Sequence, residues 1–170
     1  RGIILTKSQI EQTVDKLCKQ SRYSFDSFIK EGFIPFENGD CSFDALYAAT
    51  TPDILKMQLD CCWCDVAGKS CVSYLKKYAN RCPLLHLKDY VGQKQENMYQ
   101  LIGKDEIEVE TRAFEFRSVG AGKVDFDSIL AVAEECGVEW LIVEQDYPTP
   151  DKSSMECAEL SRLYLKSKNF

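Results

Sequence analysis

The sequence has few of the features that nucleic-acid-binding and membrane proteins need. It carries 21 Lys and Arg against 27 Asp and Glu, a formal net charge of −6, and no cluster of basic residues interleaved with aromatic ones. Such a chain offers no surface that would follow a phosphate backbone. It also has no run of about 18 uninterrupted apolar residues of the kind that crosses a bilayer. We therefore expect a cytoplasmic protein with no nucleic-acid or membrane partner.

The sequence also lacks the second cysteine pair that a structural zinc site needs. Nine cysteines are scattered along the 170 residues. The one C-x-x-C segment begins at Cys61, includes Cys62 and ends at Cys64. A chain of this length that is 45% hydrophobic can bury an ample core without disulfide bonds. We therefore expect reduced thiols in the core rather than a disulfide framework or a zinc cluster.

Histidine is the scarcest residue, and the one that is present, His86, lies in an informative place. Three short apolar runs turn abruptly polar, and each contains or ends in a candidate metal ligand: Asp60, His86 or Glu144. Parallel strands open their carboxyl ends onto one edge of a sheet, where such side chains would meet. Two carboxylates and an imidazole there predict a divalent metal site. The alternatives are that Asp60 and Glu144 are helix N-caps or surface strand ends, and that His86 is a hydrogen-bonded core residue.

Helix-like and strand-like segments alternate along the chain, which predicts an α/β fold with a parallel sheet. A polar insertion over 91–112 follows a predicted strand end and is expected to form a mobile loop over the site. We interpret Gly120-Ala121-Gly122 as a tight turn rather than a phosphate cradle. The predicted helices span 8–19, 42–49, 70–81, 127–136 and 153–166, and the predicted strands span 23–29, 56–62, 82–87 and 138–143.

A succession of segments, taken in order, carries a family resemblance. The segments are Met57-Gln58-Leu59-Asp60, Trp63, Tyr74-Leu75-Lys76-Lys77-Tyr78, Pro83-Leu84-Leu85-His86-Leu87-Lys88-Asp89, Val119-Gly120-Ala121-Gly122-Lys123-Val124-Asp125-Phe126 and Val143-Glu144-Gln145-Asp146. From about Phe36 onward the chain resembles the C-terminal half of sugar phosphate isomerases/epimerases, which are xylose isomerase-like TIM barrels related to inosose dehydratases and ketose 3-epimerases. The resemblance implies an incomplete (β/α)8 barrel, with residues 1–170 forming one truncated or internally shortened domain.

The resemblance also implies a metal centre. Asp60, His86 and Glu144 fall on three of the family's four ligand positions, and Asp26 is the candidate for the fourth. The metal would be manganese, magnesium, cobalt or zinc. Family members usually place a glutamate or histidine on the preceding strand, where this chain has Arg22-Tyr23-Ser24-Phe25-Asp26.

The implied activity is the isomerisation or epimerisation of a sugar or sugar phosphate. A proton next to a carbonyl would be removed through a metal-stabilised enediolate, and a dehydration of the inosose type belongs to the same group of reactions. Glu144 and Lys88 are the candidate catalytic residues. Trp63, Lys88 and Arg117 are the candidates for contact with the sugar.

Two alternatives stay open beside this activity. A complete barrel of this kind needs about 250 residues, so the chain could be an inactive fragment or a sugar-binding remnant. An abasic-site endonuclease of the same fold is disfavoured by the acidic charge and the single histidine. A half-barrel leaves sheet edges unpaired, which predicts a homo-oligomer or a partner that supplies the other half-barrel.

Overall fold

The computed structural model describes residues 41–93 and 114–170, which form parts of two compact units. The described part of the first unit, residues 41–56, contains helix α3 (Ser42–Ala48), which was predicted. The rings of Phe43 and Tyr47, four residues apart, contact each other on this helix with their centroids 4.8 Å apart. The helix predicted over 8–19 and the strand predicted over 23–29 lie outside the described residues.

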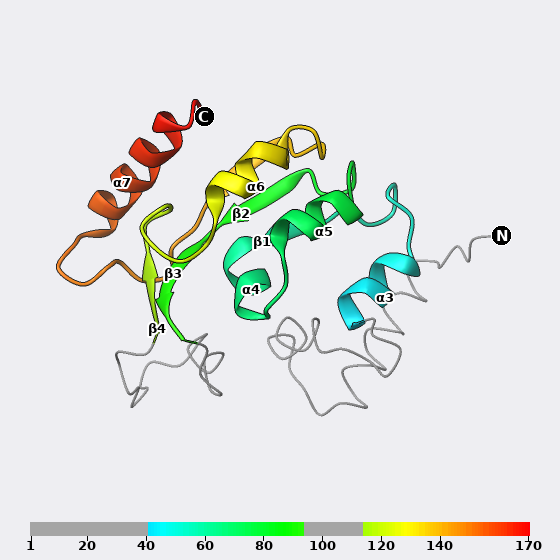
Figure 1. Cartoon of the computed structure of the whole chain (residues 1–170), viewed down its shortest axis with the longest axis horizontal. Helices are drawn as coiled ribbons and strands as arrows, with labels where there is room; N and C mark the ends of the chain where they lie inside the picture. The colour runs from blue at the N-terminus through cyan, green and yellow to red at the C-terminus, as the bar shows by residue number, and fades with distance from the viewer. Residues whose placement is uncertain (1–40, 94–113) are drawn as a thin grey trace. The chain divides into compact units, whose positions relative to one another are not determined.

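The second unit is built on three parallel strands: β1 (Gln58–Asp60), β2 (Leu84–Leu87) and β5 (Trp140–Val143). Figure 1 labels β1 and β2. Their order is β1-β2-β5, and the register places Asp60 beside His86. All three strands were predicted, and their parallel pairing confirms the expected α/β arrangement. Because the strands are parallel, their carboxyl ends lie at one edge of the sheet.

Four helices accompany the sheet: α4 (Cys61–Val66), α5 (Cys71–Lys77), α6 (Phe126–Ala133) and α7 (Ser154–Ser167). Each begins after a Ser or Asp whose side chain accepts a backbone N–H in the first turn, at positions 60, 70, 125 and 153. Helices α5 and α6 contact each other (Figure 1). None of the described helices is long and apolar enough to cross a membrane.

The core of this unit is made of strand leucines and helix side chains. Leu59, Leu85 and Leu87 are buried in the strands, and Leu75 and Phe126 are buried on α5 and α6. All eight described cysteines are free and buried, which confirms the prediction of reduced core thiols for them. Cys18 lies outside the described residues.

Two predictions of local structure are wrong. The strand predicted over 56–62 ends at Asp60, because the Asp60 side chain accepts the N–H of Trp63 and starts helix α4 there. An antiparallel pair that was not predicted, β3 (Asp89–Gly92) and β4 (Phe114–Arg117), brackets the polar insertion. The loop predicted over 91–112 therefore begins inside β3, and residues 94–113 lie outside the described part.

Strand β5 forms one edge of the three-stranded sheet and carries large exposed apolar side chains. Trp140 is 66% exposed and Val143 is 40% exposed. Exposed apolar residues on an edge strand are typical of a surface that pairs with another segment. Self-association, or pairing with a partner that supplies the other half-barrel, stays a prediction.

Candidate metal centre

The three candidate ligands come together at the carboxyl edge of the sheet. Asp60 ends β1, His86 lies in β2, and Glu144 follows β5 directly. One ligand atom of each residue lies within 4.8 Å of those of the other two, and no other such group of His, Cys, Asp or Glu occurs in 41–93 and 114–170. This juxtaposition follows from the strand register, because Asp60 pairs with His86 and Glu144 extends the neighbouring strand.

The two carboxylate oxygens of Asp60 have different partners. Its Oδ1 accepts the backbone N–H of Trp63 at 2.9 Å and caps α4. Its Oδ2 lies 3.9 Å from His86 Nδ1 and 4.0 Å from Lys88 Nζ. Asp60 is therefore both the N-cap that the alternative interpretation expected and a member of the cluster. Burial raises the pKa of Asp60 to about 6, because desolvation outweighs the hydrogen bond from Trp63 and the charge of Lys88.

The raised pKa of Asp60 predicts a pH-dependent contribution to stability. An ordinary aspartate titrates near 3.8, so between that value and about 6 the folded state keeps a proton that the unfolded state has released. We expect this group to lower the free energy of unfolding by about 1 kcal/mol as the pH rises from about 5 to about 7. Urea unfolding at both pH values measures the change. Asp60→Asn should lack this component, and an equal pH dependence in both proteins would contradict the assignment.

His86 presents Nδ1 to the carboxylates. This nitrogen lies 3.0 Å from Glu144 Oε2, while Nε2 pairs with the side-chain amide of Gln58. Gln58 therefore holds the ring with Nδ1 facing Asp60 and Glu144. Sequence reasoning missed Gln58, although the signal was available: residues two apart on a strand share a face, and Gln58 precedes Asp60 by two.

Lys88 is a buried ammonium among carboxylates. Its Nζ lies 2.9 Å from Glu144 Oε1 and 3.0 Å from Asp146 Oδ2, and its side chain is 4% exposed. Burial alone would lower the pKa of Lys88, but the charge of Asp60 and the bonds to Glu144 and Asp146 outweigh burial and raise it. Burial likewise acts to raise the pKa of Glu144, but the bond to Lys88 and its charge dominate and lower it. At neutral pH, Lys88 can stabilise negative charge but cannot accept a proton.

Aromatic rings form a wall beside Lys88. Its Nζ lies 5.5 Å from the ring centroid of Trp63 and 5.3 Å from that of Phe116. Trp63 also stacks on Phe114, with 6.1 Å between the centroids and 5° between the ring planes. Trp63, the residue predicted to contact the sugar, therefore lies near Lys88 and its carboxylate partners. Strand β4 adds Phe114 and Phe116 to the same aromatic group, and neither was predicted to be there.

The structure does not bring Arg117 into the cluster. Arg117 forms an ion pair with Glu115 and donates from its guanidinium to the Phe116 carbonyl at 3.0 Å. Alternate strand residues point to opposite faces, so Arg117 and Glu115 share the face opposite Phe116. These contacts do not support Arg117 in sugar binding, which stays a prediction. Asp26, the candidate fourth ligand, lies outside the described residues.

Asp89 fills the glycine-rich turn. Its Oδ2 accepts the N–H of Gly120 at 3.0 Å and of Gly122 at 2.8 Å, and its Oδ1 accepts those of Val124 at 3.1 Å and Tyr90 at 2.8 Å. Because the Asp89 carboxylate already accepts these backbone N–H groups, they are not available to a phosphate. The glycine-rich segment is therefore a turn held by Asp89 and not a phosphate-binding loop. Lys88 and Asp89 are neighbours in the sequence and both are buried, so they do not form a solvated ion pair.

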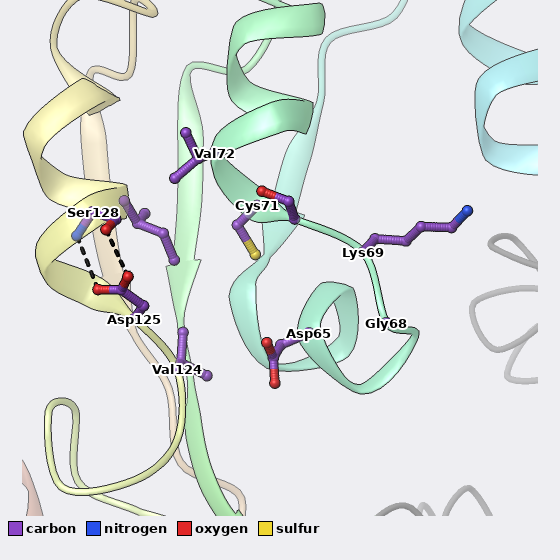
Figure 2. A pocket seen from close by; sticks show the side chains of 10 residues that line it. Asp65, Gly68, Lys69, Cys71, Val72, Val124, Asp125 and Ser128 are labelled. Atoms are coloured by element: carbon purple, nitrogen blue, oxygen red, sulfur yellow. Dashed lines mark hydrogen bonds between the residues drawn. The ribbon is translucent and has the colours of Figure 1, made fainter.

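A cavity of about 430 Å³ lies elsewhere, where α5 and α6 begin (Figure 2). Its wall includes Lys69, Ser70, Asp125 and Ser128, and none of the three candidate ligands. Asp125 accepts the backbone N–H and hydroxyl of Ser128 at 3.1 and 2.6 Å, as the dashed lines in Figure 2 mark. Those polar groups cap a helix, and none of Asp60, His86 and Glu144 lines the cavity.

Known proteins resemble much of this chain. Inosose dehydratases from Clostridium beijerinckii and Clostridium botulinum are each 29% identical to it over 131 residues, which is 74% of this chain and 42% of each relative. The inosose dehydratase of Clostridium tetani is 26% identical over 133 residues. The chain thus spans less than half the length of these relatives. No family model matches it.

Solved structures resemble the fold. Two sugar phosphate isomerases/epimerases from Parabacteroides distasonis superpose with a TM-score of 0.56 each, at 22% and 19% identity. They match 78% and 80% of this chain, and 37% and 42% of their own chains. These likenesses support the resemblance to the xylose isomerase-like family over part of its length. As predicted, the chain has the parallel α/β architecture of part of a TIM barrel.

Proposed function

We propose that this chain is part of a metal-dependent isomerase or epimerase of a sugar or sugar phosphate. The observation that carries the proposal is the convergence of Asp60, His86 and Glu144, whose ligand atoms lie within 4.8 Å of one another. Two carboxylates and an imidazole with open positions suit manganese, cobalt, zinc or magnesium. The donor set of this chain therefore fits a divalent ion.

The chain's own residues have separable roles. A divalent ion bound at this centre would polarise a sugar carbonyl and its neighbouring oxygen. Glu144 is ionised at neutral pH, and its carboxylate is the group in the cluster suited to accept a proton from a C–H next to that carbonyl. The Lys88 ammonium, 2.9 Å from Glu144 Oε1, would stabilise negative charge developing nearby. Trp63 would offer an apolar face to the C–H side of the sugar.

A second candidate is dehydration of an inosose, favoured by the 29% identity to inosose dehydratases. Both reactions begin with removal of a proton next to a carbonyl, so the same cluster would serve either. A third candidate is a sugar-binding remnant of that family without activity. The described residues supply three ligands, and an endonuclease with several metal ions would need more.

Exchange of a substrate proton with solvent tests the proposal. The protein is incubated in D2O with Mn²⁺ and inosose, or with ketohexoses and their phosphates, and deuterium next to the carbonyl is followed by ¹H NMR. We expect exchange that EDTA abolishes and Mn²⁺ restores. Asp60→Asn should slow it by more than about a hundredfold, because a ligand oxygen is lost. Asp125→Asn, the same change at another helix N-cap, should leave the rate unchanged.

The outcomes separate the candidates. Exchange that yields an isomer or epimer without loss of water supports the isomerase or epimerase, whereas loss of water from inosose supports the dehydratase. Metal binding without exchange of any substrate supports the remnant. A chain that binds no divalent metal would overturn the proposed function altogether.

A further inference from the structure

Asp146 lies in the cluster without an assigned role. It follows Glu144 by two residues, and its Oδ2 is 3.0 Å from Lys88 Nζ. Its side chain is 31% exposed, whereas that of Lys88 is 4% exposed. Lys88 is therefore held between two carboxylates that follow β5, Glu144 at 2.9 Å and Asp146 at 3.0 Å.

Lys88 is a competitor for the metal-binding oxygens. Its Nζ lies 4.0 Å from Asp60 Oδ2 and 2.9 Å from Glu144 Oε1, so a small movement would place it against both candidate ligands. A monovalent ammonium and a divalent cation favour the same partly buried carboxylates. A cluster that binds metal must therefore keep the ammonium to one side.

Asp146 supplies the restraint. It draws Lys88 toward Oε1 of Glu144, while Oε2 of Glu144 faces His86 Nδ1 at 3.0 Å. Asp146 thus holds the ammonium on the Oε1 side of Glu144, away from the oxygen that faces His86.

We propose that Asp146 is a positioning residue that anchors Lys88 on the outer oxygen of Glu144 and so keeps Oε2 of Glu144 and Oδ2 of Asp60 open to a divalent metal ion. The inference rests on the metal centre of the proposed function. It assigns Asp146 an effect that passes through Lys88, and not a role as a ligand.

A double-mutant cycle tests the inference, with Mn²⁺ affinity measured by isothermal titration calorimetry as the readout. We expect Asp146→Asn to weaken Mn²⁺ binding by about tenfold, because Lys88 then moves onto Glu144 and Asp60. Lys88→Met should bind Mn²⁺ at least as tightly as the unchanged protein. In the Lys88→Met background, Asp146→Asn should change the affinity by less than about twofold, since its target is gone.

Two further variants make the cycle decisive. Asp146→Glu keeps a carboxylate within reach of Lys88 without altering the buried lysine, and its affinity should return to within about threefold of the unchanged protein. Asp151→Asn, an exposed carboxylate at a positive φ of 65° that asparagine tolerates, is the matched control and should have no effect.

The outcomes distinguish this inference from the proposed function. If Asp146→Asn weakens Mn²⁺ binding equally in the unchanged protein and in Lys88→Met, the inference is overturned. Asp146 would then act on the metal directly, as a ligand or through its negative charge. Unchanged Mn²⁺ affinity in Asp146→Asn, or failure of Asp146→Glu to recover it, would also overturn the inference, and both leave the metal centre intact. An unchanged protein that binds no Mn²⁺ would overturn both.

Discussion

Changing Asp60 to asparagine is expected to abolish divalent metal binding while the fold persists. The two oxygens of Asp60 have different partners, Oδ1 the N–H of Trp63 and Oδ2 the cluster with His86. Asparagine caps helices as well as aspartate does, so its carbonyl can keep the bond to Trp63. Its NH2 group has no lone pair for a metal and would point into the cluster. Calorimetry with Mn²⁺ should find binding weaker by more than about a hundredfold.

A matched control separates loss of the ligand from loss of the cap. Asp125 caps α6 by accepting the N–H of Ser128 at 3.1 Å, so Asp125→Asn makes the same change at a cap outside the cluster. Thermal unfolding followed by circular dichroism should find neither variant clearly less stable than the unchanged protein, and only Asp60→Asn should lose Mn²⁺ binding. Binding of Mn²⁺ by Asp60→Asn at the original affinity would remove Asp60 from the ligand set.

The sheet was predictable because its strands carry a local signal. Short apolar runs ending in polar residues located β1, β2 and β5, and strand–helix alternation predicted that they pair in parallel. Since parallel strands share a carboxyl edge, the meeting of Asp60, His86 and Glu144 follows from the same signal. Helix α4 carries no such signal, because Cys61, Cys62, Cys64 and Val66 are all buried and leave no polar face to reveal a helical period.

The partners of Lys88 and Arg117 could not be predicted, because they depend on where distant segments meet. Lys88 reaches Glu144 across 56 residues of sequence, and no pattern around Lys88 itself indicates that partner. The face on which the Arg117 side chain lies depends on β4, a strand that sequence reasoning missed. Successive residues of a strand point to alternate faces, so a residue's face is known only when the strand and its register are known. Local patterns therefore predict which elements form, and tertiary contacts decide which polar groups meet.

Changing Asp89 to asparagine is expected to destabilise the second unit strongly. Asp89 is fully buried, and its carboxylate accepts four backbone N–H groups, two of them from Gly120 and Gly122. Asparagine offers one acceptor oxygen, so two N–H groups would face the NH2 group without a partner. Losing two charge-assisted bonds and leaving buried donors unpaired should cost about 3 kcal/mol. Urea unfolding should measure this loss, and Asp151→Asn, an exposed change of the same type, should cost less than about 0.5 kcal/mol.

A second variant tests whether the loss of stability in Asp89→Asn comes from the glycine-rich turn. A Cβ added at Gly122 would collide with the Asp89 carboxylate and the Tyr90 carbonyl, so Gly122→Ala should displace the same carboxylate from its donors. If both changes break one network, the double variant will lose clearly less stability than the two single losses added together. Simple additivity, or an Asp89→Asn protein as stable as the unchanged one, would mean that the four hydrogen bonds do not hold the turn. The turn joins β4 to α6 and borders α7, since Val119 N–H donates to the Ser161 hydroxyl at 3.0 Å, so its collapse should loosen α7 as well.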